Sequence, residues 1–485
     1  MRIAVAAVAA AVALSASSSS LRVSGFAPLS RGSARGSRPL SRGPVFENVG
    51  ARRSPTRPAA PGSGTVTGTG TVLSALNIQE NAPRDVGSMD QWATNYGVQK
   101  ADGFQLTSED GVDFGVMTTQ PLADGSPVLQ VPSNMILSSG GCRDELIQMG
   151  GNVAEAADML ARYGAGDQIQ QFYLFLKVLV EYQKGDNSPW FPWLNAMPRL
   201  FYNAVSMTDF CYECLPPLVF ALSRKERVKF DNYFDALQKV DFLDPMIKGD
   251  KDLAKWAFNI VLTRALGPDG GDKFIVPLAD MFNHGTETEV AIGFDEEGNC
   301  NAYTTKNVQE GSPLRMSYGD PSNPSYFFAK YGFLDETSPA TFCKIMLNGN
   351  DERLKNLGYD FSRMLFFKET GEISEEVWDV MLYQVLASNL EYQNAFYDAH
   401  LNGDADTKRA YHEHYFSQTS MALKEHVDNF LKQLDELSAK SIGKNLEDHP
   451  RLPLILRHNE FVKQTFLAVS QRLNAMVAER DPVGA

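Results

Sequence analysis

The sequence predicts an α+β fold in which short strands enclose a helical insert and an all-α region follows. Residues 112–131 and 273–318 alternate between apolar runs and turns, which is typical of strands. Residues 143–262 lie between them and are mostly helical by pattern, with Gly, Pro and Trp residues interrupting the pattern at 185–198. From about residue 360 the pattern is helical to the end.

The strand regions contain two recognisable turns. Residues 112–131 read as two short strands joined at Asp124 and Gly125. The run Glu296, Glu297, Gly298 and Asn299 separates two further strand-like segments, which predicts a β-hairpin.

Two apolar stripes mark the C-terminal helices. One helical face carries Leu423, Val427, Phe430, Leu431, Leu434 and Leu437, and another carries Val462, Phe466, Val469, Leu473 and Met476. Such stripes are more typical of intramolecular core than of a groove for a partner.

Composition bounds the class of protein. The 485 residues are 43% hydrophobic and 21% charged, which is ordinary for a globular chain of two or three domains. Residues 1–60 hold nine Arg and one Glu, so the remainder must carry −22 to give the total charge of −14. An acidic body argues against nucleic acid as the main partner, because phosphate binding needs a basic face.

The five cysteines give neither a disulfide framework nor a zinc site. Their odd number and wide scatter argue against disulfides, and no further ligand pair stands near Cys211 and Cys214. We expect buried or incidental thiols and no metal.

The first 60 residues have the composition of a targeting segment. The apolar stretch from Ile3 to Leu14 is too short for a membrane span and has the length of a signal-peptide core. A Ser-rich and Arg-rich stretch follows, and Ser24 to Pro28 (SGFAP) resembles the cleavage motif of two-part plastid presequences in algae with secondary plastids. We expect a plastid (chloroplast stroma) location, with secretion as the alternative. The expected organisation is a presequence over 1–60, a flexible linker over 61–90, a domain over 91–345 and a helical domain over 346–485.

The most informative motif lies at residues 274–334. An apolar run ends in Asp280, Asn283 and His284, and two Tyr-Gly pairs follow at Tyr318 and Tyr331. This motif resembles the SET-domain protein methyltransferases, within them the branch of the Rubisco large-subunit lysine methyltransferase. The helical pattern at 172–198 with Ser188, Trp190, Pro192, Trp193, Leu194 and Pro198, and the segment from Trp256 to Ala265, resemble the same branch, so the likeness covers roughly residues 100–340.

The resemblance implies an S-adenosyl-L-methionine-dependent protein-lysine N-methyltransferase with a SET-domain β-fold. It implies catalytic roles for Tyr318 and Tyr331 and substrate contacts for Arg264 and Asp280. The cofactor would be bound by Val112, Asp113, Phe114, Gly115, Asn283 and His284. The protein substrate would dock on the helical C-terminal domain, and the usual substrates of the branch are the Rubisco large subunit and fructose-bisphosphate aldolase.

The residue types suit this chemistry. The attacking lysine must be neutral although its free pKa is about 10.4, so an apolar site with a few oxygen acceptors is needed. Tyrosines supply flat apolar walls with a hydroxyl. The plainer roles are a core tyrosine for each phenol, a turn or cap for Asn283 and Asp280, a solvated His284 and a surface salt bridge for Arg264.

Two positions depart from the branch. Asp113 stands where a glycine is usual on the first strand, and Gly285 stands where serine is usual after Asn-His. These departures keep a catalytically degenerate protein-binding scaffold open. A separate alternative is a protein-histidine methyltransferase, since a relative of this branch methylates a histidine of actin.

Overall fold

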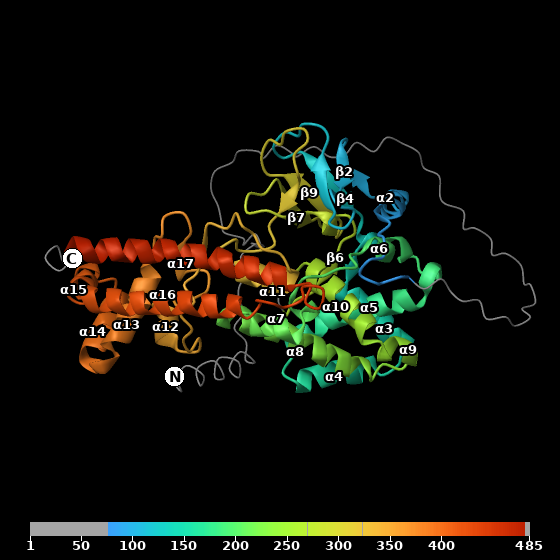
Figure 1. Cartoon of the computed structure of the whole chain (residues 1–485). Coiled ribbons are helices and arrows are strands. Elements are labelled where there is room, and N and C mark those ends of the chain that lie inside the picture. The colour runs from blue at the N-terminus through green and yellow to red at the C-terminus, as the bar shows by residue number, and fades with distance from the viewer. Residues whose placement is uncertain (1–75, 269, 323, 481–485) are drawn as a thin grey trace, which may run out of the picture.

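The computed structural model of the chain describes residues 76–268, 270–322 and 324–480. Figure 1 shows strands β2 (Phe104–Thr107), β4 (Pro127–Val131), β7 (Asn283–His284) and β9 (Cys300–Thr304) at the top, the helices of the insert packed beneath them, and the C-terminal helices extending to the left. This arrangement confirms the predicted α+β fold with a helical insert and a helical C-terminal region. The predicted presequence lies outside the described residues.

The strands are short and form several small sheets. The largest sheet has four strands in the order β1-β4-β9-β8, and the other pairs are β2-β3, β5-β6, β7-β10 and β11-β12. The strands are β1 (Gln99–Lys100), β2 (Phe104–Thr107), β3 (Gly115–Thr118), β4 (Pro127–Val131), β5 (Leu137–Ser138), β6 (Phe274–Ile275), β7 (Asn283–His284), β8 (Val290–Phe294), β9 (Cys300–Thr304), β10 (Arg315–Met316), β11 (Ala340–Phe342) and β12 (Leu365–Phe367).

The predicted hairpin is confirmed as β8-β9. The two strands pair antiparallel from Val290 opposite Thr304 to Phe294 opposite Cys300. Asp295 fixes the turn, because its Oδ1 accepts hydrogen bonds from the backbone N–H groups of Glu297 and Asn299 at 3.1 and 2.8 Å.

Residues 112–131 contain the two predicted strands, β3 and β4, but these strands join different sheets. β3 pairs with β2, and β4 lies between β1 and β9. The connection crosses between sheets because the N–H groups of Leu122 and Gly125 donate to Val308 and Thr304 carbonyls.

The helical insert fills the space beneath the strands. Its central helix α5 is buried along most of its length and packs against α3 and α10, which explains the apolar run seen in the sequence. The helices are α3 (Ser139–Met149), α4 (Val153–Arg162), α5 (Ile169–Gln183), α6 (Phe191–Ala196), α7 (Asp209–Glu213), α8 (Pro217–Leu237), α9 (Pro245–Gly249) and α10 (Lys251–Arg264). Single 3-10 turns lie at η1 (Ser133–Met135), η2 (Gly166–Gln168), η3 (Gly185–Asn187), η4 (Ala204–Ser206), η5 (Ala279–Met281) and η6 (Leu386–Ser388).

The flexible linker expected over residues 61–90 differs from the structure over its last fifteen residues. Helix α2 (Val86–Asn95) begins within this range, and Leu76 and Met89 are buried in the main core. Glu80 forms an ion pair with Arg451, the residue just before the last helix. The sequence did not predict this packing, because the segment is rich in polar and Gly residues and only a few apolar positions make the contacts.

The C-terminal helices bury both predicted stripes. Leu423, Val427, Phe430 and Leu434 of α16 and Val462, Phe466, Val469 and Leu473 of α17 belong to one core cluster, which confirms their intramolecular role. The helices after the insert are α11 (Pro324–Tyr331), α12 (Glu352–Asn356), α13 (Glu375–Val385), α14 (Leu390–Leu401), α15 (Ala405–His414), α16 (Phe416–Ala439) and α17 (Leu452–Arg480). Within the described residues, none of the helices combines the length and apolar composition that a membrane crossing requires.

All five cysteines are buried free thiols, as expected. Cys211 and Cys214 lie in a small core cluster that joins α7 and α8 to Phe328 of α11 and to Leu452 and Ile455 of α17. This cluster is the apolar part of the junction between the insert and the C-terminal helices.

The junction also contains a buried lysine. Lys344 is 5% exposed and has a left-handed backbone with φ 62°. Its Nζ donates to Ser325 Oγ at 2.9 Å, and that oxygen lies 3.2 Å from Nε2 of the fully buried His458. Burial lowers the pKa of Lys344 to about 7, with Cys343 acting weakly in the opposite direction.

We expect Lys344 to make stability rise with pH. Between pH 7 and about 10.4 the unfolded chain holds a proton on this lysine that the folded chain has lost, so raising the pH favours the folded state. Lys344→Met should therefore flatten the rise in Tm between pH 7 and 9.5. Lys432→Met, which changes a 78% exposed lysine, is the control and should leave the rise intact. Parallel profiles for all three proteins would contradict the assignment.

Candidate active site

The residues of the predicted motif meet where β7 runs parallel to β10. Asn283 lies opposite Arg315 and His284 lies opposite Met316. Tyr318 follows β10 by two residues, and Tyr331 is the last residue of α11. The pairing therefore brings Asn283, His284, Tyr318 and Tyr331 to one place, as the sequence indicated.

The two tyrosines face each other. Their ring centroids are 4.9 Å apart, and the rings of Phe327 and Phe333 lie around them. The Tyr318 hydroxyl donates to the Phe282 carbonyl at 2.7 Å, so its hydrogen is engaged and its lone pairs remain able to accept. Burial raises the pKa of Tyr318 well above its usual value, which keeps it a neutral phenol.

His284 holds Tyr318 in position. The backbone N–H of Tyr318 donates to His284 Nδ1 at 3.1 Å, and His284 Nε2 lies 3.3 Å from Asp335 Oδ2. The accepting Nδ1 places the proton of the neutral ring on Nε2. Burial lowers the pKa of His284, with Asp335 opposing the shift. Both ring nitrogens thus have neighbours within the protein. The imidazole positions Tyr318 and is not free to act as a base.

Asn283 connects this strand to the segment from Val112 to Gly115. Its Nδ2 donates to the Phe114 carbonyl at 3.4 Å. A Cβ placed on Gly115 would come within 2.6 Å of Asn283 Nδ2, so a larger residue there would displace the Asn283 amide. The structure therefore brings the two predicted halves of the cofactor site together.

Asp280 and Arg264 form a buried ion pair. The Asp280 side chain is 1% exposed, and Arg264 Nη1 lies 3.5 Å from its Oδ2 and donates to its backbone carbonyl. Trp193 Nε1 also donates to Asp280 Oδ2 at 3.1 Å. Burial raises the pKa of the Asp280 carboxyl, and Arg264 opposes that shift. The surface salt bridge considered for Arg264 is thus replaced by a buried one.

Arg84 is a residue of the site that the sequence did not reveal. Its Nε donates to the Ala196 carbonyl at 2.8 Å, its Nη1 donates to the Val112 carbonyl, and its guanidinium lies 4.8 Å from the Phe114 ring centroid. Its charge also acts on Asp113, whose pKa is raised by burial and by Asp110 and lowered by Arg84. Arg84 precedes α2 in the expected linker, where no motif marks it.

Around Arg84, the buried polar atoms without a hydrogen-bond partner among the described residues include Arg84 Nη2, Arg264 Nε, Asp280 Oδ1, Arg199 Nε and His284 Nε2. Buried polar groups are normally satisfied, so these atoms are available to a bound ligand. Guanidinium N–H groups bind a carboxylate and a carboxylate oxygen binds an ammonium, so the set fits a zwitterionic α-amino acid group. The described residues offer no group of His, Cys, Asp and Glu that could hold a metal ion.

The buried ion pair between Arg264 and Asp280 leads to a prediction about stability. Arg264→Leu should lower the free energy of unfolding by roughly 3 kcal/mol, because the Asp280 carboxylate would be left buried without its cation. Arg227→Leu is the matched control: its pair with Asp209 is largely exposed and should be worth less than about 1 kcal/mol. Urea denaturation measures both. Equal effects would mean that the Asp280 environment is solvated.

No family model matches the chain. Among curated proteins it is similar to SET domain-containing protein 4 of Artemia parthenogenetica, with 24% identity over 47% of this chain and 57% of that protein. It is also similar to the actin-histidine N-methyltransferases of Rattus norvegicus (22% identity; 51% of this chain and 42% of that protein) and Drosophila melanogaster (24%; 52% and 50%). The chain spans about half the length of the curated relatives it matches.

Solved structures give a longer match. Rubisco LSMT bound to AdoMet aligns over 83% of this chain and 94% of its own, with a TM-score of 0.53 and 15% identity. The SET domain of LSMT bound to lysine and AdoHcy aligns over 82% and 92%, with a TM-score of 0.52 and 13% identity. The chain therefore has the SET-domain fold that its sequence resemblance predicts, followed by helices that also align.

Proposed function

We propose that the protein is an S-adenosyl-L-methionine-dependent protein-lysine N-methyltransferase. The observation that carries this proposal is the set of unpartnered buried groups on Arg84, Arg264 and Asp280, beside the facing Tyr318 and Tyr331. One end of this site fits a zwitterion, and the other offers an aromatic surface to an amine.

In this proposal some residues bind the cofactor and others orient the acceptor. Arg84 and Arg264 would receive the carboxylate of the methionine part, and Asp280 would receive its ammonium. Asn283 and the segment Val112, Asp113, Phe114 and Gly115 would line the cofactor on the strand side. When bound, S-adenosylmethionine supplies a sulfonium methyl: the N–CH₃ bond forms as the S–CH₃ bond breaks, the bonding pair stays on sulfur, and the amine proton goes to solvent.

The tyrosine pair would receive the acceptor. Tyr318 Oη, with its hydrogen engaged by Phe282, offers lone pairs to an amine N–H group or to a polarised methyl. Tyr331 and Phe333 add apolar walls that favour the uncharged amine. Holding the two reactants in line is the principal contribution that the chain can make.

A histidine acceptor is the second candidate. The similarity to proteins named actin-histidine N-methyltransferase favours it, and an imidazole is also a flat neutral nucleophile at neutral pH. The third candidate, a scaffold without activity, is favoured by Asp113 and opposed by the assembled site.

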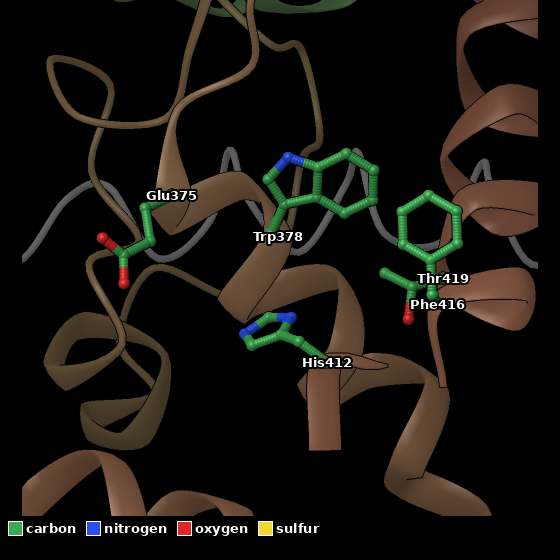
Figure 2. A pocket seen from close by; sticks show the side chains of 5 residues that line it. All are labelled: Glu375, Trp378, His412, Phe416 and Thr419. Atoms are coloured by element: carbon green, nitrogen blue, oxygen red, sulfur yellow. The ribbon is translucent and has the colours of Figure 1, made fainter. Parts of the chain in front are cut away.

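We further propose that the acceptor protein docks on the C-terminal helices. Figure 2 shows a hollow there, lined by Glu375, Trp378, His412, Phe416 and Thr419. The Trp378 and Phe416 rings are nearly parallel with centroids 6.0 Å apart, which offers an apolar contact surface. The proposed acceptors are plastid stromal proteins, the Rubisco large subunit or fructose-bisphosphate aldolase.

Two measurements test the function. Calorimetry should show S-adenosylmethionine binding to the full chain, and tritium should pass from the labelled methyl group to Rubisco, aldolase, actin or proteins of a cell extract. Hydrolysis of the labelled protein then distinguishes methyl-lysine from methyl-histidine. Absence of S-adenosylmethionine binding would support the scaffold hypothesis. Binding without methyl transfer to any of these acceptors would contradict the proposed methyltransferase activity.

We expect Arg84→Met to weaken S-adenosylmethionine binding by roughly ten- to a hundredfold, because a charged hydrogen bond to the carboxylate is lost. Arg143→Met, which changes an exposed arginine, should leave the affinity unchanged. Calorimetry under matched salt measures both. Equal affinities would place the carboxylate elsewhere.

Tyr318→Phe should lower kcat by roughly ten- to a thousandfold while leaving cofactor affinity nearly intact, because the hydroxyl acts mainly in the transition state. The aromatic wall is retained, so the comparison isolates one oxygen. Tyr303→Phe, at a 42% exposed tyrosine, is the control. Unchanged turnover in Tyr318→Phe would mean that the pair is core packing only.

We propose targeting to a plastid in two steps, with residues 3–14 acting first and the Arg-rich stretch second. A reporter fused to residues 1–60 should enter the plastid of an alga with a secondary plastid. Phe26→Ala should stop the fusion in an outer compartment. Secretion of the unchanged fusion would refute this location.

A further inference from the structure

A lysine lies directly against the proposed catalytic pair. Lys330 precedes Tyr331 on α11 and is half-buried. Its Nζ lies 4.9 Å from the Tyr331 ring centroid and 5.6 Å from that of Tyr326. It also donates to Tyr326 Oη at 3.3 Å. These contacts hold the ammonium over the tyrosine ring instead of extending it into solvent.

The Tyr331 ring is enclosed by this cation and by Tyr318. Both Lys330 Nζ and the Tyr318 ring centroid lie 4.9 Å from the Tyr331 centroid. The other charged group that acts on Lys330 is Glu226 of α8, whose Oε2 is buried without a partner in the described part of the chain. The titratable groups around the ammonium are thus Tyr326 and Tyr331 on its own helix and Glu226 on the neighbouring one.

We propose that Lys330 is a positioning residue of the acceptor site, whose fixed positive charge disfavours the protonated form of an incoming amine or imidazole. The inference rests on the proposed methyl transfer and adds a residue that the SET-domain resemblance did not supply. It follows from the place of the charge beside Tyr331, not from any contact with the acceptor.

The physical effect is a repulsion between like charges. An acceptor bound against the Tyr318 and Tyr331 pair would lie within several ångströms of the Lys330 ammonium. There a screened repulsion would lower the pKa of the acceptor by about one unit. The acceptor would release its proton to water at lower pH, and its lone pair would then be free to form the N–CH₃ bond. The negative charge of Glu226 favours the protonated acceptor. We therefore expect substitutions of Lys330 and Glu226 to move the pKa of the acceptor in opposite directions.

The experiment is the pH dependence of kcat between pH 6 and 10. The acceptor is whichever of Rubisco, aldolase and actin takes label, offered at saturation so that the profile reports the bound acceptor. Lys330→Met should move the midpoint upward by about one pH unit, and Lys330→Arg, which keeps the charge, should restore it. Glu226→Gln should move the midpoint downward. A structural role alone would change the rate without moving the midpoint.

Two results would overturn the inference. One is an unchanged midpoint in Lys330→Met with S-adenosylmethionine affinity and circular dichroism matching the unmutated protein. The other is an equal upward shift in Lys330→Arg, which would show that packing and not charge is responsible. Failure of the proposed function is distinct, because the unmutated protein would then label neither the three proteins nor a cell extract.

Discussion

The parallel pairing of β7 with β10 is the constraint on which the site depends. These strands are only two residues long, yet their register sets Asn283 beside the residues that lead into Tyr318. The hydrogen bond from the Tyr318 backbone to His284 Nδ1 extends that register by one more contact. A shift of one residue would turn His284 away from Tyr318 and remove the brace, because neighbouring residues on a strand point to opposite faces.

The site also contains several buried charges. Arg84, Arg264 and Arg199 lie together with only Asp280 and Asp113 as nearby carboxylates. Such a net positive charge is unfavourable in a dry interior unless further anionic charge arrives. A zwitterion supplies a carboxylate for the arginines and an ammonium for Asp280. The proposed cofactor site would give these unpartnered atoms their hydrogen-bond partners.

The sequence identified residues that the structure brings together, but not all of their neighbours. Asp280, Asn283, His284, Tyr318 and Tyr331 follow strong local signals, because an apolar run before polar residues and paired Tyr-Gly steps fix turns. Arg84 could not be found in this way, since its role depends on contacts with residues 112, 114 and 196 that are distant in the chain. For the same reason β3 and β4 could be predicted as strands while their different partners could not.

The two departures from the SET-domain pattern have separate physical explanations. At Gly115 a Cβ would collide with Asn283, but Asp113 is exposed and its side chain is accommodated near Arg84. At Gly285 a Cβ would come within 2.6 Å of the Glu287 carbonyl oxygen and 3.0 Å of Arg315 Cβ, so a serine would not fit this backbone. This backbone thus accommodates a side chain at position 113 but not at position 285.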